Sequence, residues 1–381
     1  MTRIAPAFEN GPAQGASPVA PRLLGFDHLH WWVGNARHTA HFFCSGLGFR
    51  VVAYAGPETG QRDRHSYVLE QGDIRFVVTN PLEPDSEMAE HVRLHGDGVR
   101  EVAYLTSDVP GAFSAVTDRG APAARAPAVY EDRDGRVVAA AVRAYGDTLH
   151  TLVDRGCYRG AFLPGYEVWD LPGAPAPGGT PRLRSYDHVV ANVEQHQLDH
   201  WVAWYERVWG MHELQHFTEA DISTAYSALR STVVWNGGAI VQPINEPAPG
   251  LRRSQIEEYL DYHGGPGVQH VALRTDDIVS TVTALRARGI RFLRVPDAYS
   301  EEAPQRLTGV ELPWERLAEL GILVDRDPHG HLLQIFTENV ASRPTVFLEV
   351  IQRQGARGFG EGNFKALFTA MEAEQARRGN L

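Results

Sequence analysis

Residues 25–33 read Gly-Phe-Asp-His-Leu-His-Trp-Trp-Val, and residues 185–193 read Ser-Tyr-Asp-His-Val-Val-Ala-Asn-Val. Both stretches have the apolar, β-branched and aromatic composition of a strand, and both carry an Asp-His pair at the same position. A second matching pair lies at 95–108 and 263–276, where Glu101 falls opposite His270. A strand signature that recurs four times along one chain indicates an internal duplication.

A segment with helical spacing follows each signature, and apolar strands separated by Gly, Asp and Pro turns come next. The expected helices cover 36–47, 110–119, 197–208 and 278–288, and a last helix is expected over 363–378. The repeating unit is therefore one strand, one helix and several strands, which predicts an α+β fold of two related halves. We expect an N-terminal tail at 1–22, a first half at 23–170, a Pro- and Gly-rich linker at 171–182 and a second half at 183–381.

The composition favours a small-molecule partner. The chain has 381 residues, of which 43% are hydrophobic and 22% charged, and its formal net charge of -11 disfavours a nucleic-acid or anionic membrane surface. No window approaches the roughly 20 continuous apolar residues of a membrane span, and residues 1–22 lack the apolar core of a signal peptide. Cys44 and Cys157 are too few for a disulfide framework, so we expect a reduced, cytoplasmic environment.

Three potential metal ligands lie in strand-like runs of the second half: His188, His270 and Glu349. Two imidazoles and one carboxylate on one face of a metal are typical of mononuclear non-heme Fe(II) oxygenases. Glu349 stands in the apolar run Val-Phe-Leu-Glu-Val-Ile, where an unpaired buried carboxylate is costly. A divalent cation held between two imidazoles would satisfy it.

The first half lacks a complete set of such ligands. Its positions that correspond to the three ligands are His28, Glu101 and Thr151, and a threonine cannot replace a carboxylate ligand. One half thus keeps a competent set that the other has lost, as expected after duplication and specialisation. We predict one metal site per chain.

Further segments carry a resemblance to a known family. They are found at 53–60, 95–99, 150–155, 162–167, 243–248, 254–260, 267–273, 332–337 and 358–368. On these segments the chain resembles the 4-hydroxyphenylpyruvate dioxygenase family of the vicinal oxygen chelate superfamily, from about residue 24 to the end. The resemblance implies two tandem halves, each an open barrel of two βαβββ modules, followed by a C-terminal helix that closes the active site.

The resemblance also implies the chemistry. It places one Fe(2+) per chain at His188, His270 and Glu349, and it implies conversion of 4-hydroxyphenylpyruvate and O2 to homogentisate and CO2 in tyrosine and phenylalanine catabolism. The substrate is an aromatic α-keto acid that also supplies the electrons, so no separate acid or base residue is expected. Relatives commonly assemble as homodimers or homotetramers.

The expected substrate pocket combines resemblance with strand alternation. The resemblance assigns it Ser231, Asn245, Gln255, Gln334, Phe336, Phe359, Asn363, Phe364 and Leu367. Alternation adds Phe347, because it shares a strand face with Glu349. Gln269 also matches a family motif, but as the strand neighbour of His270 it is expected to point to the opposite face.

Three alternatives remain at this point. 4-Hydroxymandelate synthase resembles this family and uses the same keto acid, but hydroxylates the benzylic carbon. The aromatic Phe364 and the complete Pro-Ile-Asn-Glu-Pro passage at 243–247 favour the dioxygenase. Extradiol ring-cleaving dioxygenases share the ligand types, although the Asn-Phe-Lys segment at 363–365 argues against them. The third alternative, a non-catalytic small-molecule-binding module, is usually much shorter and lacks a full ligand set.

Overall fold

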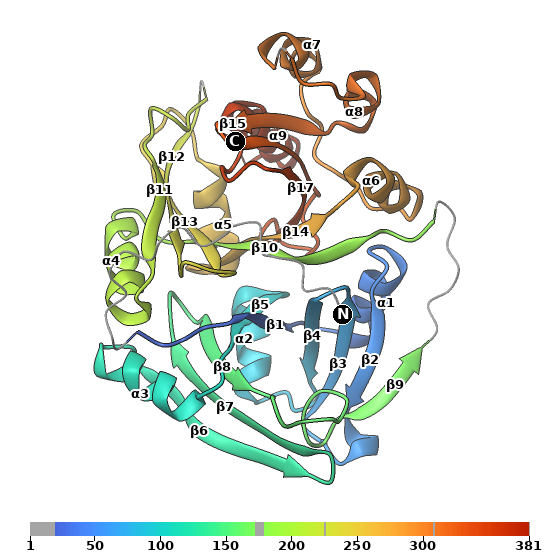
Figure 1. Cartoon of the computed structure of the whole chain (residues 1–381), viewed down its shortest axis with the longest axis vertical. Helices are drawn as coiled ribbons and strands as arrows, with labels where there is room; N and C mark the ends of the chain where they lie inside the picture. Colours follow the sequence, from blue (N-terminus) through green and yellow to red (C-terminus); the bar gives the residue numbers. More distant parts are fainter. Residues whose placement is uncertain (1–19, 172–178, 225, 308, 381) are drawn as a thin grey trace.

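The computed structural model describes residues 20–171, 179–224, 226–307 and 309–380. Most of the expected tail and linker lies outside these residues. The described chain forms a nine-stranded sheet with the order β6-β7-β8-β5-β1-β4-β3-β2-β9 and an eight-stranded sheet with the order β11-β12-β13-β10-β14-β17-β16-β15. Figure 1 shows the two sheets as curled units, the blue to green half below the yellow to red half. Among the described residues, no helix is long and apolar enough to cross a membrane.

Each half is built from two modules joined by a helix. The first half comprises β1 (Gly25–Trp32), α1 (Ala36–Ser45), β2 (Arg50–Ala55), β3 (Arg64–Gln71), β4 (Ile74–Pro81), the joining helix α2 (Glu87–His95), β5 (Gly98–Leu105), α3 (Val109–Asp118), β6 (Ala123–Asp132), β7 (Gly135–Arg143) and β8 (Leu149–Asp154). A short strand, β9 (Glu167–Leu171), pairs with β2 and forms one edge of this sheet.

The second half repeats this order. It comprises β10 (Leu183–Asn192), α4 (Leu198–Trp209), β11 (His212–Phe217), β12 (Ala228–Trp235), β13 (Val241–Ala248), the joining helix α5 (Gln255–His263), β14 (Gly267–Thr275), α6 (Ile278–Ala287), α7 (Asp297–Arg306), α8 (Trp314–Leu320), β15 (Leu323–Asp327), β16 (Gly330–Phe336), β17 (Phe347–Gln354) and α9 (Glu361–Arg378). The predicted α+β duplication of βαβββ modules is confirmed. The sequence patterns did not predict α2, α5, α7, α8 or β9.

The strand register confirms the correspondence between the halves. In the second sheet His188 is paired with Ala272, and Ala272 is paired with Glu349 on the next strand. In the first sheet His28 is paired with Ala103, which is paired with Thr151. His270 is paired with Val190, and Glu101 with the equivalent His30, so all three positions lie on equivalent rungs of neighbouring strands.

Local sequence signals explain where the predicted helices begin. The carboxylate of Asp108 accepts from the backbone N–H of Gly111 at the start of α3, and Asp277 does the same for Ser280 at the start of α6. Such caps satisfy the backbone donors that a first helical turn leaves unpaired. The same kind of cap therefore starts the equivalent helix in both halves.

Candidate metal centre

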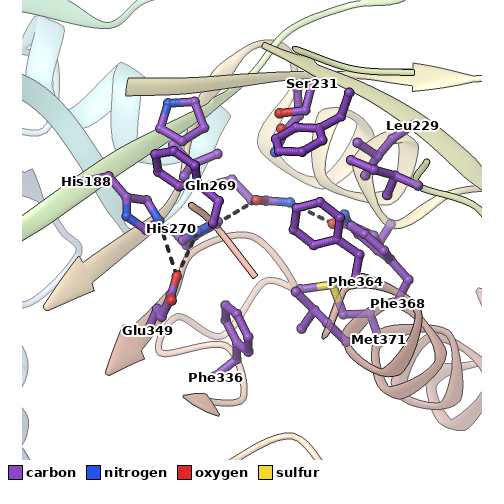
Figure 2. Close-up of a pocket in the computed structure, with 18 of the residues that line it drawn as sticks. His188, Leu229, Ser231, Gln269, His270, Phe336, Glu349, Phe364, Phe368 and Met371 are labelled. Carbon is purple, nitrogen blue, oxygen red and sulfur yellow. Dashed lines mark hydrogen bonds and ion pairs between the residues drawn. The ribbon is translucent and has the colours of Figure 1, made fainter. Parts of the chain in front are cut away.

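The three predicted metal ligands converge inside the curl of the second sheet. His188 projects from β10, His270 from β14 and Glu349 from β17, and Figure 2 shows the two imidazoles directed at one carboxylate oxygen. The Oε2 atom of Glu349 lies 3.3 Å from Nε2 of His188 and 3.5 Å from Nε2 of His270. Potential ligand atoms of all three lie within 4.8 Å of one another.

The residue before each histidine holds the other ring nitrogen. The Nδ1 atom of His188 is 2.8 Å from Oδ1 of Asp187, and the Nδ1 atom of His270 is 2.8 Å from Oε1 of Gln269. A ring nitrogen that donates its proton to such an acceptor leaves Nε2 unprotonated and able to bind a metal. Both rings thus turn Nε2 toward Glu349.

Two register shifts explain this arrangement and correct the expectation for Gln269. Pairing between β10 and β14 skips one residue between Tyr186 and His188 and one between Val268 and His270. At such a bulge the extra residue departs from strict alternation, so it can lie beside its neighbour instead of across the sheet. Gln269 consequently lines the pocket and donates from Nε2 to Oε1 of Gln255 at 2.7 Å.

Arg353 holds Asp187 in place. Its guanidinium donates from Nε and Nη2 to the two carboxylate oxygens of Asp187, each at 2.8 Å, and both side chains are buried. Burial alone raises the pKa of Asp187, but Arg353 and His188 outweigh it and keep that pKa below its usual range. The same pair exists in the first half, where Arg155 binds Asp27 at 2.7 and 2.6 Å.

The triad meets the chemical requirements of a metal. The Oε1 atom of Glu349 is buried and has no hydrogen-bond partner among the described residues. Burial lowers the pKa of His188, but Glu349 and Asp187 outweigh burial and raise it to about 9. The triad therefore attracts positive charge, and a divalent ion would satisfy both carboxylate oxygens and both imidazoles.

A cavity opens beside the triad and gathers most of the predicted pocket residues. The predicted residues that line it are Ser231, Asn245, Gln255, Gln334, Phe336, Phe347, Phe359, Phe364 and Leu367. Phe336 and Phe347 lie close to His270, with ring centroids 6.2 and 4.8 Å away. The amide and hydroxyl groups and the aromatic side chains thus enclose the same space as the three predicted ligands.

Asn363 is the exception. Its side chain is fully buried but does not line the cavity, and its Oδ1 accepts from the hydroxyl of Tyr299 at 2.6 Å. The adjacent Phe364 enters the cavity instead, because successive residues of a helix point in directions about 100° apart. Asn363 ties the first turn of α9 to α7 and is placed as a structural residue.

Sequence reasoning also missed several lining residues. They are Val190, Phe217, Ile222, Leu229, Val233, Pro243, Gln269, Phe368 and Met371. A period of two along β12 would have linked Leu229 and Val233 to Ser231, and a helical period along α9 would have linked Met371 to Leu367. Figure 2 shows Phe364, Phe368 and Met371 on the helix that covers the cavity.

The equivalent place in the first half is filled by an ion pair. Arg125 donates to both carboxylate oxygens of Glu101, at 3.1 and 2.5 Å, and to the hydroxyl of Thr151 at 3.1 Å. The buried carboxylate there is already satisfied by a guanidinium and a hydroxyl, so the first half does not repeat the unsatisfied carboxylate oxygen of Glu349.

Comparison with known proteins agrees with this geometry. Residues 185–335 match the glyoxalase/bleomycin resistance protein/dioxygenase superfamily. 4-Hydroxyphenylpyruvate dioxygenase of Aspergillus fumigatus is 44% identical over 393 residues, which cover 97% of each chain. The enzyme of the same name from Xenopus tropicalis is 45% identical over 378 residues, which cover 97% of this chain and 95% of its own.

A solved structure has the same fold as this chain. A mutant of 4-hydroxymandelate synthase from Streptomyces coelicolor superposes with a TM-score of 0.81 and 36% identity, over 93% of this chain and 99% of its own. The full-length relatives at higher identity carry the family assignment. With its duplicated fold and converging His, His and Glu, the chain belongs to the 4-hydroxyphenylpyruvate dioxygenase family.

Proposed function

We propose that this chain converts 4-hydroxyphenylpyruvate and O2 to homogentisate and CO2, with one Fe(2+) held by His188, His270 and Glu349. The observation that carries the proposal is the convergence of these three side chains at one end of an aromatic cavity. The full-length relatives named above support the same reaction.

Charge and donor type fit the pairing of this metal with this substrate. Two neutral imidazoles and one carboxylate leave a divalent iron with a net charge of +1, which the anionic keto acid neutralises. Bound iron supplies the activation of O2, with electrons from decarboxylation of the keto acid. The chain itself orients the ligands, holds the ring and excludes water.

We assign the parts of the substrate to different residues of the cavity wall. We assign the aromatic ring to Phe336, Phe347, Phe359, Phe364 and Leu367, because apolar side chains bind a phenyl ring by burying its faces. We assign the phenolic hydroxyl to the polar group Ser231, Asn245, Gln255 and Gln334. The hydrogen bond from Gln269 fixes the amide of Gln255 before substrate arrives.

A second candidate is benzylic hydroxylation of the same keto acid, which the structural similarity to 4-hydroxymandelate synthase favours. The dioxygenase relatives are more similar in sequence, at 44 and 45% against 36%. Phe364 also narrows the cavity with a full aromatic ring, which packs against Phe217 with ring centroids 5.1 Å apart. We therefore rank ring hydroxylation first.

The deciding experiment is anaerobic loading with Fe(2+), followed by 4-hydroxyphenylpyruvate, oxygen and mass analysis of the product. We expect one oxygen consumed per substrate, with homogentisate and CO2 formed. Hydroxymandelate as the main product would establish the second candidate instead. Tight substrate binding without oxygen uptake would show a non-catalytic binding module. Light scattering on the same sample tests the homodimer or homotetramer that the family resemblance supports.

A further inference from the structure

A second group of potential metal ligands lies in the first half. His91 and His95 are one turn apart on α2, and Asp147 lies in the loop between β7 and β8. Potential ligand atoms of these three residues lie within 4.8 Å of one another. Side chains four positions apart on a helix share a face, so both imidazoles can approach one ion. None of the three residues lines the cavity described above.

Both ring nitrogens of His95 face acceptor oxygens. Its Nδ1 atom is 2.7 Å from the backbone oxygen of His263, and its Nε2 atom is 2.9 Å from Oδ2 of Asp147. Since a carbonyl only accepts, Nδ1 carries a proton, and a neutral ring then turns the lone pair of Nε2 toward a carboxylate. The His95 side chain is only 4% exposed, so little water reaches its ring nitrogens. A cation between Nε2 and Oδ2 would remove the repulsion between the lone pair of His95 and the carboxylate of Asp147.

His91 offers a further lone pair. Neither of its ring nitrogens has a hydrogen-bond partner among the described residues, and its ring lies 4.3 Å from that of His95, centroid to centroid. Burial is the largest cause of the lowered pKa of His91, which falls to about 3. The imidazole is therefore neutral at physiological pH, which is the form that binds metals.

Asp147 supplies the negative charge and the route to solvent. Partial burial raises the pKa of Asp147, but the adjacent His95 outweighs it and lowers that pKa. Its side chain is 49% exposed, so an ion can enter from this side and keep a water ligand. The nearby Arg100 is paired with Glu87 at 3.1 Å.

We propose that His91, His95 and Asp147 form a second site, apart from the predicted catalytic one, for a divalent transition metal ion, for which Zn2+ is the best fit. Two imidazoles and one carboxylate are donors that zinc commonly accepts in a tetrahedral site, and a water completes the set. The backbone oxygen of His263 fixes the tautomer of His95, as such partners do for metal-bound histidines. The predicted catalytic metal and its pseudo-repeat positions in the first half use none of these residues.

The site lies where the two halves of the chain meet. His263 ends α5 of the second half, and Arg343 donates to the backbone oxygens of Leu94 and Arg93 beside the site and to that of Tyr262. An ion at His95 would hold the end of α2 against the loop at Asp147, next to these contacts. Its expected effect is stabilisation of this junction, with no part in turnover.

The test is zinc titration of the chelator-treated full-length chain, with bound metal measured by equilibrium dialysis and elemental analysis. We expect two tightly bound Zn2+ per wild-type chain. Glu349→Gln and the pair His91→Gln with Asp147→Asn should each retain one, and the combined variant none. His41→Gln changes an exposed histidine of α1 and serves as the matched control, which should retain two.

Two further readouts separate the sites. Co2+ added to the Glu349→Gln variant should give visible absorption bands, and Zn2+ should raise its melting temperature; both effects should vanish when His91→Gln and Asp147→Asn are added. A single zinc per wild-type chain, unchanged by these two substitutions, would overturn the proposal and leave His95 and Asp147 as an imidazolium–carboxylate pair. None of these measurements depends on turnover, so the reaction proposed above can fail without affecting them.

Discussion

At Arg353, one guanidinium connects a predicted ligand to the segment before the last helix. It binds Asp187, which orients His188, and its Nη1 donates to the backbone oxygen of Gly358 at 2.6 Å. The first half contains the same group, because Arg155 binds Asp27 beside His28. Only Arg353 lies in the half with a complete ligand set. Substituting each arginine in turn therefore separates an effect on metal binding from an effect on stability.

Arg353→Met should weaken metal binding about 10- to 100-fold, since partners that orient ligands contribute that much to affinity. It also leaves Asp187 buried without its cation, which should lower the free energy of unfolding by about 3–5 kcal/mol. Co2+ titration and urea denaturation measure the two effects.

Arg155→Met is the control. It should lose less stability, because Asp27 keeps a second cation, Arg75, at 3.5 Å, and it should keep wild-type metal affinity at the His188 site. Equal losses of metal affinity in the two variants would show that Arg353 acts only through general stability.

A second residue-scale prediction concerns the carboxylates. Glu349→Gln should abolish iron binding and turnover, because the neutral amide replaces the single anionic ligand. Glu101→Gln should keep both, and should cost about 1.5–3 kcal/mol of stability through its weakened hydrogen bonds to Arg125. Iron content and oxygen uptake of the two purified variants decide the matter, and turnover in Glu349→Gln would refute the ligand assignment.

At the scale of the element, α9 depends on a glycine at each end. Gly360 has φ +81° before the first turn, and Gly379 has φ +75° after the last. A Cβ at Gly360 would lie 2.6 Å from Nε2 of Gln334, whereas a Cβ at Gly379 would have no neighbour within 4 Å. The first glycine therefore sets both the backbone turn and the place of a pocket amide.

Gly360→Ala should reduce turnover at least tenfold without changing the bound iron, because it displaces Gln334 or the start of the helix. Gly379→Ala should cost only the backbone strain, about 1–2 kcal/mol, and retain activity. Steady-state oxygen uptake with iron analysis compares the pair. Loss of iron from Gly360→Ala would contradict a role confined to the pocket wall.

At the scale of the whole molecule, the two repeats pack against each other through a shared core. One apolar cluster joins residues of both halves, including Leu29 and Tyr104 from the first and Val189 and Leu273 from the second. The hydroxyl of Tyr104 also donates to Gln242 across the junction at 2.5 Å. The two repeats thus share a core, and the boundaries expected at 23–170 and 183–381 stay a prediction.

Residues 183–381 expressed alone should consequently expose this shared surface, bind a hydrophobic dye and lose metal affinity. The full chain should unfold in one transition, with tryptophan fluorescence and circular dichroism coinciding. A separate fragment that binds metal as tightly as the full chain would show that the halves are independent domains.

Features that neighbouring residues encode were predicted from the sequence, whereas most features that depend on distant residues were not. The four predicted module helices begin within one residue of their observed positions, because caps and apolar periodicity are local. α2 and α5 were not predicted, although each joins two modules. Most of the pocket residues were predicted by resemblance. Asn363 points away from the cavity, because a helix fixes the direction of each side chain relative to its neighbour.

By itself the sequence determined the duplication, the α+β class and the three residues that meet beside the cavity, because repeated strand signatures and residue chemistry are written along the chain. Only the tertiary structure decided that Asp187 and Gln269 stand beside the histidines, since a bulge exists only between paired strands. It likewise decided that Asp147 meets His91 and His95. The first two contacts depend on pairing between strands that are far apart in the sequence, and Asp147 lies 52 residues from His95, so no local periodicity encodes them.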